Sequence, residues 1–345
     1  MKYFITGGCG FIGTNIALSF KKNLFKEILI LDNLTKPSSR ENLKILKKNK
    51  ISFLKIDIAK SKKKIENLIK KHKPKVIIHL AGQVAMSTSL KYPDQDFRGN
   101  VLSTINLLES VRKFSTKSKF IFSSTNKVYG DFTNYKYIER KLRYDFKNKI
   151  KGFSENNNLN FKSPYSCSKG SADQYVLDYS RVYNLHTVVF RHSSVYGGRQ
   201  FFTYDQGWVG WFCAQALKHK YLKKTKFSVT GNGKQVRDLV HINDITKLYK
   251  SAINNFSKVK GNAFNIGGGY KNSLSILELL KFLQKKLNIK LNYYFIKNRP
   301  YDQKIFISDN KKIYKILKWT PKITYKKGIH EILDWIKISN IYKNV

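Results

Sequence analysis

One loop constrains the fold of this chain more than any other feature. Residues 6–13 read TGGCGFIG; they directly follow a short β-rich run, Tyr3–Thr6, and open a helical pattern at about residues 10–22. In a strand–loop–helix unit of this kind, Gly7 permits a tight turn, Gly10 lets the backbone approach a pyrophosphate, and Gly13 lets the helix pack close to the sheet. Because the N-terminus of the helix faces the anion, the unit predicts a dinucleotide-binding site.

An acidic residue lies where such a site needs one. Asp32 ends the second β-rich run, about 20 residues after the loop. A carboxylate there holds the ribose hydroxyls of the adenosine and repels a 2′-phosphate, so NAD is favoured over NADP, a preference that Lys36 and Arg40 weaken. Asp57 follows the third run, where it either contacts the adenine or serves as a helix N-cap.

The order of patterns along the chain predicts an α/β fold. Short β-rich runs alternate with helical patterns in the first half, which is typical of a parallel sheet covered on both faces. After the sixth run the pattern becomes irregular. We predict a Rossmann-type doubly wound parallel sheet in residues 1–190 and a smaller, mainly substrate-binding lobe in residues 191–345, from which about residues 235–260 return to the first domain. Strands are expected at 3–6, 27–31, 51–56, 76–80, 119–123 and 187–191, helices at 10–22, 101–114, 166–183 and 328–338, and loops at 197–207 and 231–238.

A threonine, a tyrosine and a lysine are the candidate catalytic residues. Tyr165 and Lys169 share one face at the start of a predicted helix, and Thr125 follows the fifth strand, at the edge of the sheet where ligands bind. The tyrosine oxygen can take a hydroxyl proton while the carbon gives hydride to a nicotinamide, and Thr125 can orient the same oxygen. The tyrosine pKa of ~10 must fall by roughly three units, or about 4 kcal/mol, for this work near neutrality. One cation at ~4 Å contributes about 4 kcal/mol at an effective dielectric constant of ~20, and Lys169 and an oxidised nicotinamide are two such cations.

The net charge of +44 raises the question of a polyanionic partner. Only ten of the 66 basic residues are arginine, and the lysines are scattered. Where lysines cluster, in residues 60–72, Ile65, Leu68 and Ile69 keep helical spacing and the lysines occupy the solvated side. We therefore expect no specific nucleic-acid partner, although the charge can attract anionic nucleotide substrates.

No segment suggests a membrane or an oxidising compartment. No run approaches the ~18 apolar residues of a membrane helix, and the first strand begins too early for a signal peptide to precede it. The three cysteines, Cys9, Cys167 and Cys213, lie far apart, which indicates neither a disulfide framework nor a metal site. A cytoplasmic protein without a membrane partner is the expectation.

Several strings resemble the extended short-chain dehydrogenases/reductases that act on nucleotide sugars, the NAD-dependent epimerase/dehydratase family. These strings are TGGxGFIG at the loop, His79-Leu80-Ala81-Gly82, Ser123-Ser124-Thr125, Val128-Tyr129-Gly130 and Tyr165-x-x-x-Lys169. The resemblance covers essentially the whole chain. It implies cofactor contacts by Gly7, Gly10, Phe11, Ile12, Gly13, Asp32, Asn33, Asp57, Ile58, Leu80, Ala81, Gly82, Tyr165 and Lys169.

The second half resembles the same family in its nucleotide-binding segments. Residues 231–238, 265–267 and 299–303 follow in the family's order, which implies that Arg237 and Arg299 meet the substrate pyrophosphate. A guanidinium fork suits phosphate, and the alternative for each arginine is a surface ion pair.

Two residues bear on the choice of reaction. The 4,6-dehydratases of the family carry Asp-Glu after the catalytic threonine, as acid and base, whereas this chain has Asn126-Lys127, so dehydration is not expected.

Longer strings in residues 83–86, 124–131, 163–170, 190–194 and 204–212 are similar to the family's epimerases that invert C2 of a CDP-linked 3,6-dideoxyhexose for surface polysaccharide. The resemblance implies substrate contacts by Gln83, Asn126, Lys127, His192, Gln206, Arg237 and Arg299. His192 is alternatively structural.

Two other functions stay open at this point. One is a nucleotide-sugar 4-epimerase or 4-reductase on the same scaffold, and the other is a non-catalytic, RNA-associated member of the family. An intact Thr125, Tyr165 and Lys169 argue against the second. A homo-oligomer, dimer or tetramer, is usual among the relatives.

Overall fold

A seven-stranded parallel sheet forms the centre of the molecule. The computed structural model describes residues 3–22, 27–148, 150–223, 226–298 and 302–344. The strands lie in the order β12-β8-β5-β4-β1-β2-β3, and every neighbouring pair is parallel. Because the order reverses between β1 and β4, the carboxyl ends of these two strands flank the switch point at which doubly wound folds bind ligands. The bounds are β1 Tyr3–Thr6, β2 Ile28–Asp32, β3 Ser52–Lys55, β4 Val76–His79, β5 Lys119–Thr125, β8 Thr187–His192 and β12 Asn262–Ile266.

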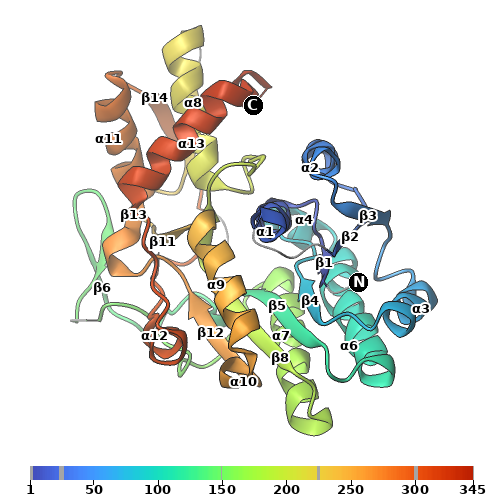
Figure 1. Cartoon of the computed structure of the whole chain (residues 1–345). Helices are drawn as coiled ribbons and strands as arrows, with labels where there is room; N and C mark the ends of the chain where they lie inside the picture. Colours follow the sequence, from blue (N-terminus) through green and yellow to red (C-terminus); the bar gives the residue numbers. More distant parts are fainter. Residues whose placement is uncertain (1–2, 23–26, 149, 224–225, 299–301, 345) are drawn as a thin grey trace.

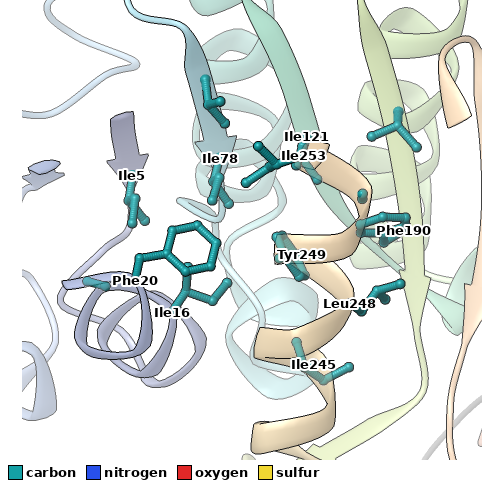
Figure 2. Packing of buried hydrophobic residues seen from close by; sticks show 14 of the residues in the cluster. Ile5, Ile16, Phe20, Ile78, Ile121, Phe190, Ile245, Leu248, Tyr249 and Ile253 are labelled. Carbon is teal, nitrogen blue, oxygen red and sulfur yellow. The ribbon is translucent and has the colours of Figure 1, made fainter. Parts of the chain in front are cut away.

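Helices cover both faces of this sheet, as its unbroken apolar strands require. On one face, α1 (Phe11–Lys22) and α9 (Ile242–Asn254) pack against β1, β4, β5 and β8. Figure 2 shows Phe20 on α1 and Tyr249 on α9 in this layer, beside strand residues such as Ile78 and Phe190. On the other face, α3 (Lys62–His72), α6 (Ser103–Phe114) and α7 (Pro164–Tyr183) form a second core cluster. The predicted doubly wound sheet is confirmed.

The second lobe has a core of its own. Its helices α8 (Trp208–Leu222), α11 (Ile276–Leu287) and α13 (Tyr325–Ser339) lie at the top of Figure 1, and their apolar side chains form a separate buried cluster. Two small sheets accompany them. In one, β10 (Lys226–Thr230) pairs with β14 (Asn292–Ile296); in the other, β11 (Val236–His241) pairs with β9 (Ser194–Tyr196), β13 (Ser273–Ser275) and β15 (Ile305–Phe306).

Shorter elements connect these parts. The helices are α2 Pro37–Lys48, α4 Met86–Lys91, α5 Pro93–Asp96, α10 Phe256–Val259 and α12 Lys311–Leu317, together with a π-helix η1 at Phe97–Leu102 and 3-10 turns η2 Asn126–Tyr129, η3 Tyr270–Asn272 and η4 Ile341–Asn344. A hairpin of β6 (Tyr137–Glu139) and β7 (Tyr144–Phe146) lies in the long segment between Thr125 and Tyr165.

The structure differs from the sequence-based elements in several places, and β12, α8, α9 and α11 were not predicted as elements. The loop expected at 231–238 ends early, because β11 begins at Val236 and pairs with three other strands. The helix expected from residue 101 begins with the π-helix η1 at Phe97. Helix α2 was not predicted, since its many polar residues show no long apolar stripe. The chain returns to the sheet through α9 and β12, while the domain bounds near residue 190 stay a prediction.

None of the described helices combines the length and the apolar character that a transmembrane span requires.

Candidate active site

A cleft lies at the carboxyl ends of the central strands. Its volume is about 830 Å³, and its walls come from the loop after β1, the ends of β2, β4 and β5, the start of α7, and residues 195–207. All fourteen predicted cofactor residues line it. Thr125 lines it too, as do three predicted substrate residues, Gln83, His192 and Gln206.

The glycine loop has the tight geometry that a dinucleotide needs. Gly7 adopts a left-handed φ of 63°, and an added Cβ there would lie 2.6 Å from the Ala81 nitrogen. A Cβ at Gly13 would lie 2.6 Å from the Gly8 Cα, so α1 starts hard against the loop. An added Cβ at Gly10 meets only the Gly7 oxygen, at 3.0 Å, and Gly10 itself lines the cleft. These residues therefore leave a backbone-lined cradle that fits a pyrophosphate.

Asp32 and Asp57, the two acidic residues predicted to face the adenosine of the cofactor, accept hydrogen bonds from backbone amides. Asp32 accepts hydrogen bonds from the Cys9 amide at 3.0 Å and the Leu34 amide at 2.9 Å, which ties the glycine loop to the end of β2. Burial raises the pKa of Asp32, and these two bonds oppose that rise. Asp57 accepts from the Ala59 amide and from the Asn33 side chain, so it caps a turn rather than the N-terminus of α3.

The first turn of α7 positions the candidate catalytic pair. Ser163 and Ser166 form a capping box, in which each side chain binds the backbone amide of the other, and Pro164 fixes the start of the helix. This places Tyr165 and Lys169 against the end of β5. The Lys169 ammonium donates to the Ser123 carbonyl at 2.6 Å, and Tyr165 has a hydrogen bond with the Thr125 hydroxyl. The predicted threonine–tyrosine–lysine group is thus assembled in one place.

The protonation of this group differs from the expectation in one respect. Burial raises the pKa of Tyr165 to about 12, because desolvation outweighs the hydrogen bond from Thr125. Burial also lowers the pKa of Lys169 to about 8, against the opposing charges of Asp173 and Asp96. In the chain by itself, Lys169 does not make Tyr165 a base at neutral pH, so a further positive charge is needed.

Two buried carboxylates beside Lys169 were not predicted. Asp96 is 1% exposed and accepts from Gln83 at 2.7 Å and Ser89 at 2.5 Å. Asp173 is fully buried and forms a bidentate ion pair with Arg191. Asp173 lies four residues after Lys169, so its place on the same helix face was readable from the sequence. Asp96 follows Pro93 in a polar stretch, and nothing local in the sequence marks it as buried.

The substrate residues predicted on the cleft wall have these contacts. The Gln83 amide donates to Asp96 and to the Ala85 carbonyl, so its side chain is anchored. His192 lies opposite Thr125 in the register of β5 and β8; its Nε2 is 3.0 Å from the Tyr249 hydroxyl, and its Nδ1 has no hydrogen-bond partner among the described residues. Burial lowers the pKa of His192 to about 3, so the ring is neutral. Gln206 accepts from Lys36 at 3.4 Å.

The remaining substrate residues lie off the cleft wall, in a polar cluster around Asp302. Lys127 and Arg237 both donate to Asp302, at 3.0 Å and 2.6 Å, and Asn126 donates to Gln303 at 2.9 Å. Segments far apart in the chain are thus brought together, as the resemblance implied, but their contact with a substrate stays a prediction. Arg299 lies outside the described residues.

Comparison with known proteins places this geometry in a family. The family model described as GDP-mannose 4,6 dehydratase matches residues 4–332. CDP-paratose 2-epimerase of Salmonella typhi is 49% identical over 336 residues, which are 97% of this chain and 99% of that protein. A dTDP-glucose 4,6-dehydratase of Salmonella typhimurium is 28% identical over 350 residues, with 97% and 92% covered.

Solved structures agree over the full length. The UDP-glucuronic acid 4-epimerase of Bacillus cereus, in complex with UDP-glucuronic acid and NAD, superposes with a TM-score of 0.83 at 26% identity and covers 98% of this chain and 100% of its own. The UDP-glucose 4-epimerase of Thermotoga maritima with UDP-glucose gives a TM-score of 0.83 at 26% identity, with 99% and 100% covered. The chain belongs to the NAD-dependent epimerase/dehydratase family of extended short-chain dehydrogenases/reductases.

Proposed function

We propose that this protein is an NAD-dependent epimerase that inverts C2 of CDP-paratose to give CDP-tyvelose, through a transient 2-keto sugar. The observation that carries the proposal is the assembly of Thr125, Tyr165 and Lys169 on the wall of a cleft that begins at the glycine loop. The 49% identity to a CDP-paratose 2-epimerase over nearly all of both chains supports the choice of substrate and carbon.

The cleft supplies the binding half of this chemistry. NAD, when bound, provides a reversible acceptor for the hydrogen of the carbon that is oxidised. Gly7, Gly10 and Gly13 leave room for its pyrophosphate. Asp32 would hold the adenosine ribose, which favours NAD over NADP.

Tyr165 would move the proton. Its hydroxyl has a hydrogen bond with Thr125, which would orient the reacting sugar oxygen, and Lys169 lies one helical turn further along α7, with its ammonium on the Ser123 carbonyl. Tyr165 takes the proton of the C2 hydroxyl during oxidation and returns it during reduction from the other face of the sugar. Both half-reactions use the same three side chains, and only the sugar has to turn between them.

Asn126 and Lys127 support an epimerase over a dehydratase. Removal of water needs an acid and a base beside the reacting carbons, and the dehydratases place Asp-Glu after the threonine. Here the amide of Asn126 bonds Gln303 and the ammonium of Lys127 pairs with Asp302. Neither side chain provides the carboxyl pair.

The second lobe would bind the nucleotide of the substrate. Lys127 and Arg237 present two cations that share one carboxylate, Asp302, which leaves a net positive cluster. Such a cluster suits a pyrophosphate. His192, Gln83 and Gln206 on the cleft wall would then face the sugar.

The reaction is tested with CDP-paratose deuterated at C2. Hydride transfer moves the label to the cofactor and back, so the CDP-tyvelose formed should keep deuterium at C2, and turnover of unlabelled substrate in heavy water should introduce none. Loss of label to water would exclude hydride transfer. Inversion at C4 of another nucleotide sugar, with label retained, would keep the mechanism and refute the carbon. Steady consumption of NADPH would indicate a reductase.

Assembly and location are part of the proposal. We expect a homo-oligomer, a dimer or tetramer, in the cytoplasm. Phe97 on η1 and Tyr175 and Val182 on α7 are exposed apolar side chains at neighbouring elements, which supports an interface there. Light scattering coupled to gel filtration would give the mass, and cell fractionation the compartment.

A further inference from the structure

The loop of residues 197–207 is fastened to three separate elements of the dinucleotide half. At its start, the Asn15 side chain on α1 donates to the Gly198 carbonyl at 3.1 Å. Near its end, Gln206 accepts from Lys36 at the N-cap of α2 at 3.4 Å, and Asp205 accepts from the Ser87 hydroxyl on α4. The loop therefore lies along the cleft, and residues 199–201 form part of the cleft wall.

Arg199 is the cation that this loop brings to the cleft. Its guanidinium donates to the neutral Asn15 amide oxygen at 3.1 Å, and no ion pair with a carboxylate is found for it among the described residues. Other shielded arginines differ, since Arg191 and Arg143 each bind a carboxylate. Burial lowers the pKa of Arg199, although a guanidinium stays protonated in proteins. A partly buried cation with only a neutral partner is a ready site for an anion.

The backbone conformation of Arg199 is a second indication of a ligand site. Its φ of 67° lies in the left-handed region, which is unfavourable for a residue other than glycine. Such strain persists where surrounding contacts over-determine it, and it is concentrated at ligand sites. The three fastenings of the loop are contacts of that kind.

The position of Arg199 identifies the anion. Asn15 is the fifth residue of α1, one helical turn after the glycine loop whose amides face a pyrophosphate. The guanidinium therefore lies on the cleft wall, near the positive end of α1. The basic cluster at Asp302, in contrast, has no residue on this wall.

We propose that Arg199 binds the pyrophosphate of the bound dinucleotide, and that loop 197–207 is a strap that keeps the cofactor in place between turnovers. The inference rests on the proposed function, because an epimerase that regenerates its own cofactor has no need to release it. A charge-assisted bond from a guanidinium to phosphate can change affinity by about 10- to 100-fold.

The test compares cofactor retention in purified wild-type protein, Arg199→Gln and Arg40→Gln. Arg40 is exposed and does not line the cleft, so its variant removes the same charge nearby without the contact. NAD content is read by absorbance and mass of the denatured supernatant, and release is followed by repeated gel filtration. We expect Arg199→Gln to release NAD about 10- to 100-fold faster and Arg40→Gln to behave as wild type.

A second variant tests the strap without changing Arg199, so a folding defect caused by the Arg199 substitution cannot explain its result. Ser87→Ala unfastens the far end of the strap on an exposed helix and leaves the arginine intact. It should also speed NAD release, by a smaller factor. Wild-type protein that binds no NAD would refute the proposed function itself. If wild type carries NAD and Arg199→Gln releases it at the same rate, only this inference fails. A raised KM for the nucleotide sugar with unchanged NAD retention would assign Arg199 to the substrate and overturn it as well.

Discussion

At the scale of single residues, the central question is how a tyrosine with a raised pKa serves as a base. Burial raises the pKa of Tyr165 to about 12 and lowers the pKa of Lys169 to about 8. A positive charge brought into the cleft lowers the pKa of Tyr165 toward neutrality, and it lowers the pKa of Lys169 further. A tyrosine in this setting is a base while that charge is present and an acid once it is gone. That alternation is what successive oxidation and reduction of one sugar require.

Tyr165→Phe should abolish turnover and leave NAD content unchanged. The substitution removes only the phenolic oxygen, and loss of general acid–base catalysis costs on the order of 10²–10⁴ in rate. Thr125→Val should cost less, since Thr125 orients the sugar oxygen without moving its proton. Single-turnover rates and cofactor content measure both. A near wild-type rate in Tyr165→Phe would require another base.

Asp96→Asn should shift the pH–rate profile to lower pH. The negative charge of Asp96 raises the pKa of Tyr165 and that of Lys169. Its removal lowers both, so the limb that reports deprotonation of Tyr165 and the limb that reports deprotonation of Lys169 both move toward acid. The isosteric amide preserves most of the packing around Gln83 and Ser89.

Asp178→Asn is the matched control for Asp96→Asn. Asp178 lies toward the C-terminal end of α7, partly exposed and paired with Arg181. Its variant should keep the wild-type profile. A profile that drops in height for Asp96→Asn without moving along the pH axis would assign Asp96 a structural role only.

At the scale of elements, the cap of α7 couples helix stability to the site. Ser163→Ala removes the side chain that accepts from the Ser166 amide, at a cost of about 0.5–2 kcal/mol. We expect Tm to fall by roughly 2–4 °C per kcal/mol, and kcat to fall as well, because Tyr165 lies in the capped turn.

Thr324→Ala separates the two effects. Thr324 caps α13 in the other lobe, where its side chain accepts from the Lys327 amide. This variant should lower Tm with kcat unchanged. If Ser163→Ala lowered Tm alone, the first turn of α7 would hold its geometry without the cap.

Six of the seven strands of the central sheet were predicted, because each is a short, buried apolar run that can be recognised from its own residues; β12 (Asn262–Ile266), in the irregular half of the pattern, was not. Val76–His79 and Thr187–His192 are buried along their whole length, which is the apolar run that parallel strands show. The small sheets of the second lobe were not predictable in this way. β11 pairs with β9, β13 and β15, which lie far apart in the chain and are two or three residues long.

The same distinction between local and long-range features separates the site residues whose place was predictable from those whose place was not. The cofactor residues follow strand ends, and the topology places strand ends together, so all of them reach the cleft. Lys127 and Arg237 depend on how the two lobes meet, and they lie against Asp302 instead of on the cleft wall. Arg199 escaped prediction because its role depends on the path of an irregular loop.

At the scale of the whole molecule, the dominant property is the net charge of +44. Several ion pairs of the described residues join side chains three positions apart on one helix. Most lysines face solvent. Charge spread in this way raises the local concentration of any anion and gives no fixed geometry for reading a base. Anionic nucleotide sugars benefit from the same field.

This distribution predicts weak and salt-sensitive binding to nucleic acid. Association with a short DNA or RNA duplex should be detectable at low salt and fall steeply as salt is raised, because counterion release supplies its free energy. Two duplexes of unrelated sequence should compete equally, and CDP-sugar turnover should continue when the duplex is bound, since the cleft is lined by the dinucleotide residues. Fluorescence anisotropy across a salt series measures the first, and competition the second. A complex that survives high salt and prefers one sequence would mean that the basic surface contains an ordered recognition site, and the lysine excess would then have a partner of its own.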